Sequence, residues 1–164
     1  TDSGGFSFSN VSSQTHEIAS KLIAYDFSAS DICEHFLKKV SFNVFNLRMR
    51  ALSKAKFFED GKIGLIYFSQ EDFLATDTAP EDTEGAINYI RDIDTVEVAA
   101  AITQTRQSNS YKVSIRTSDR VDASRIASVF GGGGHKNAAG CRISGFYEDV
   151  KDKLLKACSD ELYQ

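Results

Sequence analysis

The chain has 164 residues, 41% hydrophobic and 26% charged, and carries a net charge of −4 at pH 7. A chain of that length forms one domain, or one domain with a piece of another. The net negative charge argues against nonspecific binding of long nucleic acids. No apolar run is long enough to cross a bilayer, and no secretory signal opens the chain. Three cysteines without CxxC spacing indicate reduced thiols, which favours a cytoplasmic protein over a disulfide scaffold or a zinc site.

Helices are predicted for the first third of the chain. The apolar periodicity predicts one helix over Thr15–Asp26, a second capped by Ser30 or Asp31, and a third over Phe45–Phe57. These elements show no core of their own. Residues 1–53 are therefore expected to be the C-terminal remnant of another domain, together with linker helices.

Residues 54–164 predict one complete α/β domain, with a small mixed sheet flanked by helices. A continuous apolar run, Ile63–Ser69, is typical of a buried strand, and a polar connection over 70–80 follows it. The elements expected after this connection are a helix over Thr83–Ile93, hairpin strands over Val96–Thr105 and Tyr111–Thr117, a helix over Val121–Phe130, a strand over Cys141–Ser144 and a helix over Phe146–Tyr163.

The charges of this domain are divided along the sequence. Between Glu71 and Glu97 there are nine acidic residues and one basic residue, whereas between Arg106 and Arg142 there are seven Lys or Arg and two Asp. A local positive field in an acidic protein favours a small anionic ligand. The alternative is that these charges lie on solvated faces of helices and strands.

A glycine run, SVFGGGGHKNAAGC over 128–141, interrupts the basic block. Five of the eleven glycines lie in it, and neither its spacing nor its position after a helix fits a phosphate-binding loop of the GxxxxGK or GxGxxG kind. The backbone amides of Gly131, Gly132, Gly133 and Gly134 are expected to form a concavity for an oxyanion, with a helical turn over His135–Ala139 adding further free amides. The alternative is a helix C-cap followed by a loop.

The segments EGAINYIRDIDTVEVAAAI, YKVSIRTSDRVDASRIASVFGGGGHKNAAGC and TDSGGFSFSN resemble the DHH phosphoesterase superfamily. The glycine run resembles the signature of its C-terminal DHH-associated domain (DHHA1), and the opening TDSG resembles the last motif of the catalytic DHH domain. The resemblance is strongest to bacterial nano-RNases, which also act as phosphatases on 3′-phosphoadenosine 5′-phosphate. No DHH triplet or DxD cluster occurs in this sequence, so the chain is expected to be the C-terminal part of a longer protein, beginning in a truncated DHH domain.

The resemblance implies a metal site of which this sequence holds one ligand. Family members bind two manganese ions between carboxylates and histidines of the DHH domain, and Asp2 matches the aspartate of the TDSG motif. One carboxylate does not hold a metal ion alone, so no catalytic residue set is complete here, and the chain by itself is expected to be inactive and free of manganese. The alternative for Asp2 is a frayed terminal residue.

The resemblance also implies substrate-binding residues. His135 would touch the substrate phosphate, and Arg116 would hold the end of the substrate away from the scissile bond. A guanidinium grips phosphate in a bidentate way, and an imidazole donates a hydrogen bond to a phosphate oxygen. Asn137 and Gly131–Gly134 complete the expected site. The alternative for Arg116 is a strand arginine that faces solvent.

The function implied is the substrate-binding part of a manganese-dependent phosphoesterase for short RNA oligonucleotides or phosphorylated nucleotides. Its expected partners are these ligands and the upstream DHH domain, with a homodimer as one assembly of the intact protein. Two alternatives stay open: a cyclic-dinucleotide phosphodiesterase of the same superfamily, and a nucleotide- or RNA-binding module without catalysis.

Overall fold

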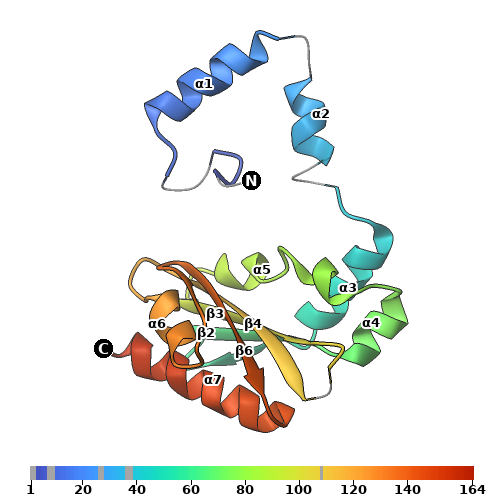
Figure 1. The fold of residues 1–164 in the computed structure, drawn as a ribbon, viewed down its shortest axis with the longest axis vertical. Helices are drawn as coiled ribbons and strands as arrows, with labels where there is room; N and C mark the ends of the chain where they lie inside the picture. The colour runs from blue at the N-terminus through green and yellow to red at the C-terminus, as the bar shows by residue number, and fades with distance from the viewer. Residues whose placement is uncertain (1–2, 7–9, 26–27, 36–38, 108) are drawn as a thin grey trace. The chain divides into compact units, whose positions relative to one another are not determined.

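The computed structural model describes residues 3–6, 10–25, 28–35, 39–107 and 109–164. The chain forms two compact units, Thr1–Ser41 and Phe42–Gln164 (Figure 1). This division differs from the expected boundary after residue 53 by one helix, α3 (Phe42–Leu52), which belongs to the second unit and buries Leu47 and Ala51 completely. In the described part of the chain, no helix is both long enough and apolar enough to cross a membrane.

The described part of the first unit includes the helices α1 (Ser13–Ile23) and α2 (Ala29–Cys33). The hydroxyl of Ser12 caps α1 by accepting a hydrogen bond from the amide of Thr15. Ser28 caps α2, so the predicted caps, Ser30 and Asp31, were placed too late in the sequence. None of the residues of α1 is buried, so this helix leaves its apolar side chains exposed.

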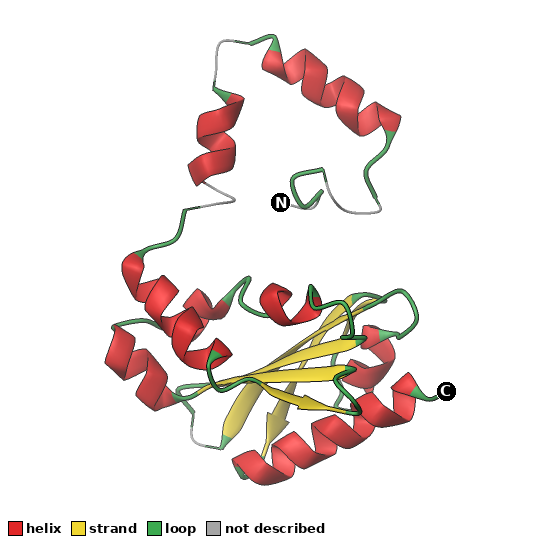
Figure 2. Ribbon diagram, turned by 180° about the vertical axis from the view of Figure 1, so that it is seen from behind, coloured by secondary structure: helices red, strands yellow, loops and turns green. Residues whose placement is uncertain are grey.

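The second unit is a six-stranded sheet with helices on both faces (Figure 2). The strands lie in the order β1-β2-β3-β4-β6-β5, with β2 and β3 parallel and all other neighbours antiparallel. The predicted class, a mixed sheet flanked by helices, is confirmed. The elements are β1 (Lys56–Phe58), β2 (Ile63–Phe68), α4 (Gln70–Thr76), a 3-10 helix η2 (Pro80–Thr83), α5 (Asn88–Arg91), β3 (Val98–Gln104), β4 (Ser110–Thr117), α6 (Ala123–Ser128), β5 (Gly133–His135), β6 (Ala138–Ser144) and α7 (Tyr147–Leu162).

The two faces of the sheet are covered to different extents. One face packs against α6 and α7, and all strands except β1 and β5 supply buried residues to that core, among them Ile102, Val113 and Cys141. The other face packs against α3 and α5, but only β2 and β3 contribute to its core. No residue of β4, β5 or β6 belongs to this second core, so the part of the sheet that holds the basic block and the glycine run keeps an open face.

Several predicted elements differ from the structure. The predicted helix over Phe45–Phe57 ends at Leu52 as α3, and strand β1 occupies Lys56–Phe58. The predicted helix over Thr83–Ile93 is a 3-10 turn and the short helix α5, because Gly85 adopts a φ of +82° that interrupts helical geometry. The predicted polar connection over 70–80 contains α4, whose capping sequence Ser69-x-x-Asp72 was overlooked. The predicted helical turn over His135–Ala139 is wrong, since this segment is the tip of a hairpin between β5 and β6.

A buried carboxylate, that of Asp72, joins α4 to α3. Its side chain is 1% exposed and accepts hydrogen bonds from Lys54 at 2.8 Å, from Arg50 at 3.1 Å and from the hydroxyl and amide of Ser69. Burial by itself raises the pKa of Asp72, but the hydrogen bonds from Lys54, Ser69 and Arg50 outweigh it and lower this pKa from 3.8 to about 2. The ionised carboxylate therefore stabilises the folded state.

The replacement Asp72→Asn should lower the free energy of unfolding at pH 7 by about 2 kcal/mol, the equivalent of this pKa shift. Because the folded pKa lies below the unfolded one, this stability is present above pH ~4 and is lost as the pH falls toward ~2. Urea unfolding from neutral to acidic pH measures it. The control is Glu71→Gln, an exposed neighbour on the same helical turn. Equal stability of the two variants at neutral pH would contradict this role of Asp72.

Candidate functional site

The strand register brings the predicted residues Arg116 and His135 to one face of the sheet. Arg116 of β4 lies opposite Ala138 of β6, and Ala138 lies opposite His135 of β5. Residues that pair directly across strands share a face, and neighbouring strands lie about 4.8 Å apart. The backbones of Arg116 and His135 are therefore about 10 Å apart, on the face that the second core leaves open.

Small residues form the floor between these two side chains. The next row of the register joins Ser114 of β4, Gly140 of β6 and Gly133 of β5. Together with Ala138, these residues put only a hydroxyl and a methyl group above the sheet. A surface without bulky side chains results, with a guanidinium on one side and an imidazole on the other.

The guanidinium of Arg116 is half-buried. Its Nη1 donates a hydrogen bond to the carbonyl of Ile115 at 3.0 Å, and no ion pair joins it to an acidic side chain among the described residues. Burial lowers the pKa of Arg116, the nearby charge of Arg91 lowers it further, and Glu84 raises it. A partly desolvated cation beside a second cation favours the binding of an anion.

The first two glycines of the run end helix α6. The amide of Gly131 donates to the carbonyl of Ser128, and the amide of Gly132 donates to that of Ala127, both at 3.0 Å. Gly131 has a φ of +69°, so these residues form a Schellman-type C-cap. The prediction that all four glycine amides surround an anion is therefore wrong for Gly131 and Gly132, whose amides serve the helix.

Close packing explains two of the four glycines. A Cβ on Gly132 would lie 2.3 Å from the carbonyl oxygen of Gly140, and a Cβ on Gly134 would lie 2.5 Å from that of Ala138. Gly133 differs, because a Cβ there would meet nothing within 4 Å and its φ is not in the left-handed region. The fold does not require glycine at position 133, so the missing side chain leaves space on the open face.

The hairpin tip is anchored to the start of α6, and this anchoring positions His135. The carbonyl of Lys136 accepts a hydrogen bond from the amide of Ala123 at 2.6 Å. The side-chain amide of Asn137 donates to Asp119 at 2.9 Å. The side-chain amide of Asn137, a predicted substrate-binding residue, is thus engaged in a hydrogen bond within the protein. The imidazole of His135 is exposed and forms no hydrogen bond or ion pair with any described residue.

Asp2, the predicted metal ligand, falls outside the described residues. Two further arginines of the basic block are paired with acidic side chains: Arg120 with Glu97 and Arg125 with Glu161, each at 3.3 Å. Among the residues that the structure describes, no three His, Cys, Asp or Glu side chains come together to hold a metal ion. The described residues of the open face therefore do not fit a manganese site.

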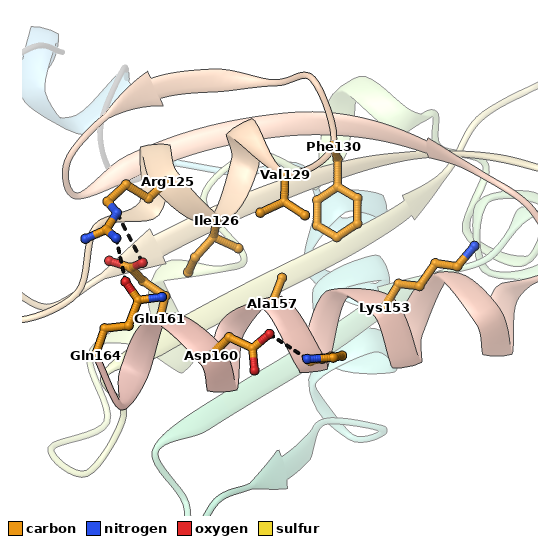
Figure 3. Close-up of a pocket in the computed structure, with 10 residues that line it drawn as sticks. Arg125, Ile126, Val129, Phe130, Lys153, Ala157, Asp160, Glu161 and Gln164 are labelled. Carbon is orange, nitrogen blue, oxygen red and sulfur yellow. Dashed lines mark hydrogen bonds and ion pairs between the residues drawn. The ribbon is translucent and has the colours of Figure 1, made fainter.

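A groove of about 460 Å³ between α6 and α7 is a separate feature on the opposite face (Figure 3). Apolar side chains such as Ile126 and Phe130 form much of its lining. Of its charged groups, Arg125 pairs with Glu161 and Lys156 pairs with Asp160. Two of its cations are thus engaged by carboxylates, and Arg116, Gly133 and His135 lie outside this groove.

The fold and the glycine hairpin define an α/β domain with an open, cation-bearing sheet face, and comparison with known proteins gives its family. The family model of the DHHA1 domain matches residues 65–164. The chain therefore belongs to the DHHA1 family, the C-terminal domain of the DHH superfamily, as its motifs predicted. It is 26% identical over 163 residues to the bifunctional oligoribonuclease and PAP phosphatase NrnA of Thermus thermophilus, spanning 99% of this chain and 48% of NrnA.

Solved structures share this fold. An exopolyphosphatase-related protein from Bacteroides fragilis matches with a TM-score of 0.87 and 26% identity, over 97% of this chain and 46% of that one. The pGpG-specific phosphodiesterase PggH of Vibrio cholerae matches with a TM-score of 0.53 and 14% identity, over 98% of this chain and 55% of that one. The chain thus spans about half the length of these relatives.

Sequence reasoning missed several parts of the open face. The row Ser114–Gly140–Gly133 depends on the pairing of β4, β6 and β5, which the order of elements along the chain does not specify. Arg91 and Glu84 act on Arg116 from the segment around α5, and no local pattern indicates that proximity. The alternation of Lys112, Ser114 and Arg116 was the one available signal, since it places all three on the same face of a strand.

Proposed function

We propose that the open face of β4, β6 and β5 binds the nucleotide part of a phosphoester substrate. On this proposal the chain is the substrate-binding part of a cytoplasmic, manganese-dependent phosphoesterase for short RNA oligonucleotides or 3′-phosphoadenosine 5′-phosphate. The observation that carries it is the row Arg116–Ala138–His135, in which a guanidinium and an imidazole, both able to donate hydrogen bonds to phosphate, flank a floor of small residues. The identity to NrnA supports the choice of substrate class.

Each residue of the face has a defined task in this proposal. The planar guanidinium of Arg116 donates two hydrogen bonds to one phosphate group, which fixes its orientation. His135 donates to an oxygen of the phosphate that is to be cleaved. Gly133, which the fold itself does not require, lets the ligand approach the strand closely. Manganese would be held by residues other than those described, and would activate water for attack on phosphorus.

Nuclear magnetic resonance tests where the ligand lies. Titration of the chain with 3′-phosphoadenosine 5′-phosphate should shift the amide resonances of Gly133, His135 and Ser114, and the side-chain resonances of Arg116. Shifts confined to the groove between α6 and α7 would overturn the proposal. Titration with adenosine, which lacks phosphate, is the control and should produce much smaller shifts at Arg116.

A further inference from the structure

The open face carries a second pair of cations beyond the proposed nucleotide site. Lys112 of β4 lies directly opposite Arg142 of β6, and both side chains are exposed. They belong to the same face as Arg116, because residues 112, 114 and 116 alternate with the buried residues of β4. The pair lies four residues along the strand from Arg116, or about 13 Å away.

This pairing is unfavourable for the protein alone. Side chains directly opposite each other in an antiparallel pair have Cβ atoms about 5 Å apart, and like charges in this arrangement are destabilising. Within the described part of the chain, neither Lys112 nor Arg142 forms an ion pair with an acidic residue. The sequences of the three strands, SYKVSIRT, GGH and AAGCRIS, contain no Asp or Glu. No acidic side chain of these three strands therefore offsets the repulsion.

The surface between the two cationic groups is accessible. Ser114 and Gly140 occupy the intervening row, and a Cβ on Gly140 would contact only the carbonyl oxygen of Val113, at 3.1 Å. A ligand that leaves the site at Arg116 along the strands meets no bulky side chain in that row. It then reaches Lys112 and Arg142. A single phosphate does not span about 13 Å, whereas a chain of linked nucleotides does.

We infer that Lys112 and Arg142 form a second phosphate site, which binds the backbone of an oligoribonucleotide beyond the nucleotide held at Arg116 and His135. This inference rests on the proposed function, because it takes the first nucleotide to lie at Arg116. The second site selects for length: it adds affinity for oligonucleotides long enough to reach it and none for a mononucleotide. The ligand is a single strand, since the two cationic groups lie along one line of the sheet and contact one phosphate backbone.

Affinity as a function of length tests this inference. Binding of adenosine mononucleotide, dinucleotide and pentanucleotide to the chain is measured by isothermal titration calorimetry, for the unmodified protein and for the double variant Lys112→Gln, Arg142→Gln. The double variant should bind the pentanucleotide about tenfold more weakly, as expected for the loss of two exposed ion pairs. Its affinity for the mononucleotide should not change.

Salt dependence gives an independent measurement. Each phosphate contact on a single strand contributes about 0.7 to the slope of log K against log salt concentration. The double variant should therefore show a slope smaller by about 1.4 for the pentanucleotide. The matched control is Lys153→Gln, Lys156→Gln, which removes the same charge from α7 on the other face and should leave both slope and affinity unchanged.

The outcomes separate this inference from the proposed function. Binding of the mononucleotide with no gain for the pentanucleotide, or an unchanged affinity in the double variant, would overturn the second site and leave the proposed function intact. A protein that binds neither ligand would overturn both. The same titration is repeated with inorganic polyphosphate of matched charge. Tighter binding of polyphosphate than of the pentanucleotide would overturn the assignment to a nucleotide chain.

Discussion

The replacement Gly132→Ala should destabilise the second unit by about 3 kcal/mol, at the upper end of the usual cost of overpacking. The added methyl group would lie 2.3 Å from the carbonyl oxygen of Gly140, 2.5 Å from the Cβ of Cys141 and 2.8 Å from its Cα. These atoms are part of β6, which pairs with both β4 and β5. Backbone of a paired strand does not move aside as a flexible side chain does, so either the hairpin or the end of α6 must shift.

The matched variant is Gly133→Ala, one residue along the chain. It meets no atom within 4 Å and has no left-handed φ, so its free energy of unfolding should stay within about 0.5 kcal/mol of the unmodified protein. Its methyl group projects over the open face, so binding of 3′-phosphoadenosine 5′-phosphate should weaken. Urea unfolding followed by circular dichroism, together with calorimetric titration, measures both effects. Equal stability of the two variants would contradict the division of the run into structural and ligand-facing glycines.

The core strands were predictable from the sequence because each carries a strong local pattern. Ile63–Phe68 is a continuous apolar run, and β2 indeed lies inside the sheet with both faces covered. The C-terminal helix was predicted at 146–163 and is found at Tyr147–Leu162, since its apolar residues repeat with helical spacing. Such elements are fixed by neighbours within a few residues, and short-range reasoning finds them.

The elements that were mispredicted depend on contacts or geometry outside the local pattern. Residues 83–93 have the periodicity of a helix, but Gly85 and the packing of Ala86, Ile87 and Ile90 on the sheet divide the segment. The glycine run was predicted to bind an anion through its amides, and the structure gives its residues separate roles. Gly131 and Gly132 end a helix, and Gly134 allows β6 to approach closely. The sequence alone does not distinguish these tasks from ligand binding, because each of them requires the absence of a Cβ.

The predicted site residues Arg116 and His135 share one face of the sheet, for a reason that the sequence does not contain. The family resemblance gave both as substrate-binding residues, but their common face follows from the register of three strands. Strand β6 lies between β4 and β5, although the chain passes through β5 first. Register is a tertiary property, and this explains why Ser114, Gly140 and the cations at positions 112 and 142 could not be assigned to a common surface beforehand.

The replacement Arg116→Ala should weaken binding of 3′-phosphoadenosine 5′-phosphate by about 100-fold, the upper value for the loss of a hydrogen-bonded charge, about 3 kcal/mol. The thermal midpoint should hardly change, because the guanidinium contributes one hydrogen bond to the carbonyl of Ile115 and lies beside the like charge of Arg91. Calorimetric titration measures the affinity, and differential scanning calorimetry measures the midpoint.

Two further variants separate charge from geometry. Arg116→Lys keeps the positive charge but loses the planar fork, so its affinity should fall between those of the alanine variant and the unmodified protein. Arg120→Ala removes an arginine that is 84% exposed and paired with Glu97, and it should bind the nucleotide normally. A marked loss of stability in Arg116→Ala with unchanged affinity would make Arg116 a structural residue. The phosphate would then have to be held at His135 and Gly133, without a guanidinium to oppose its charge.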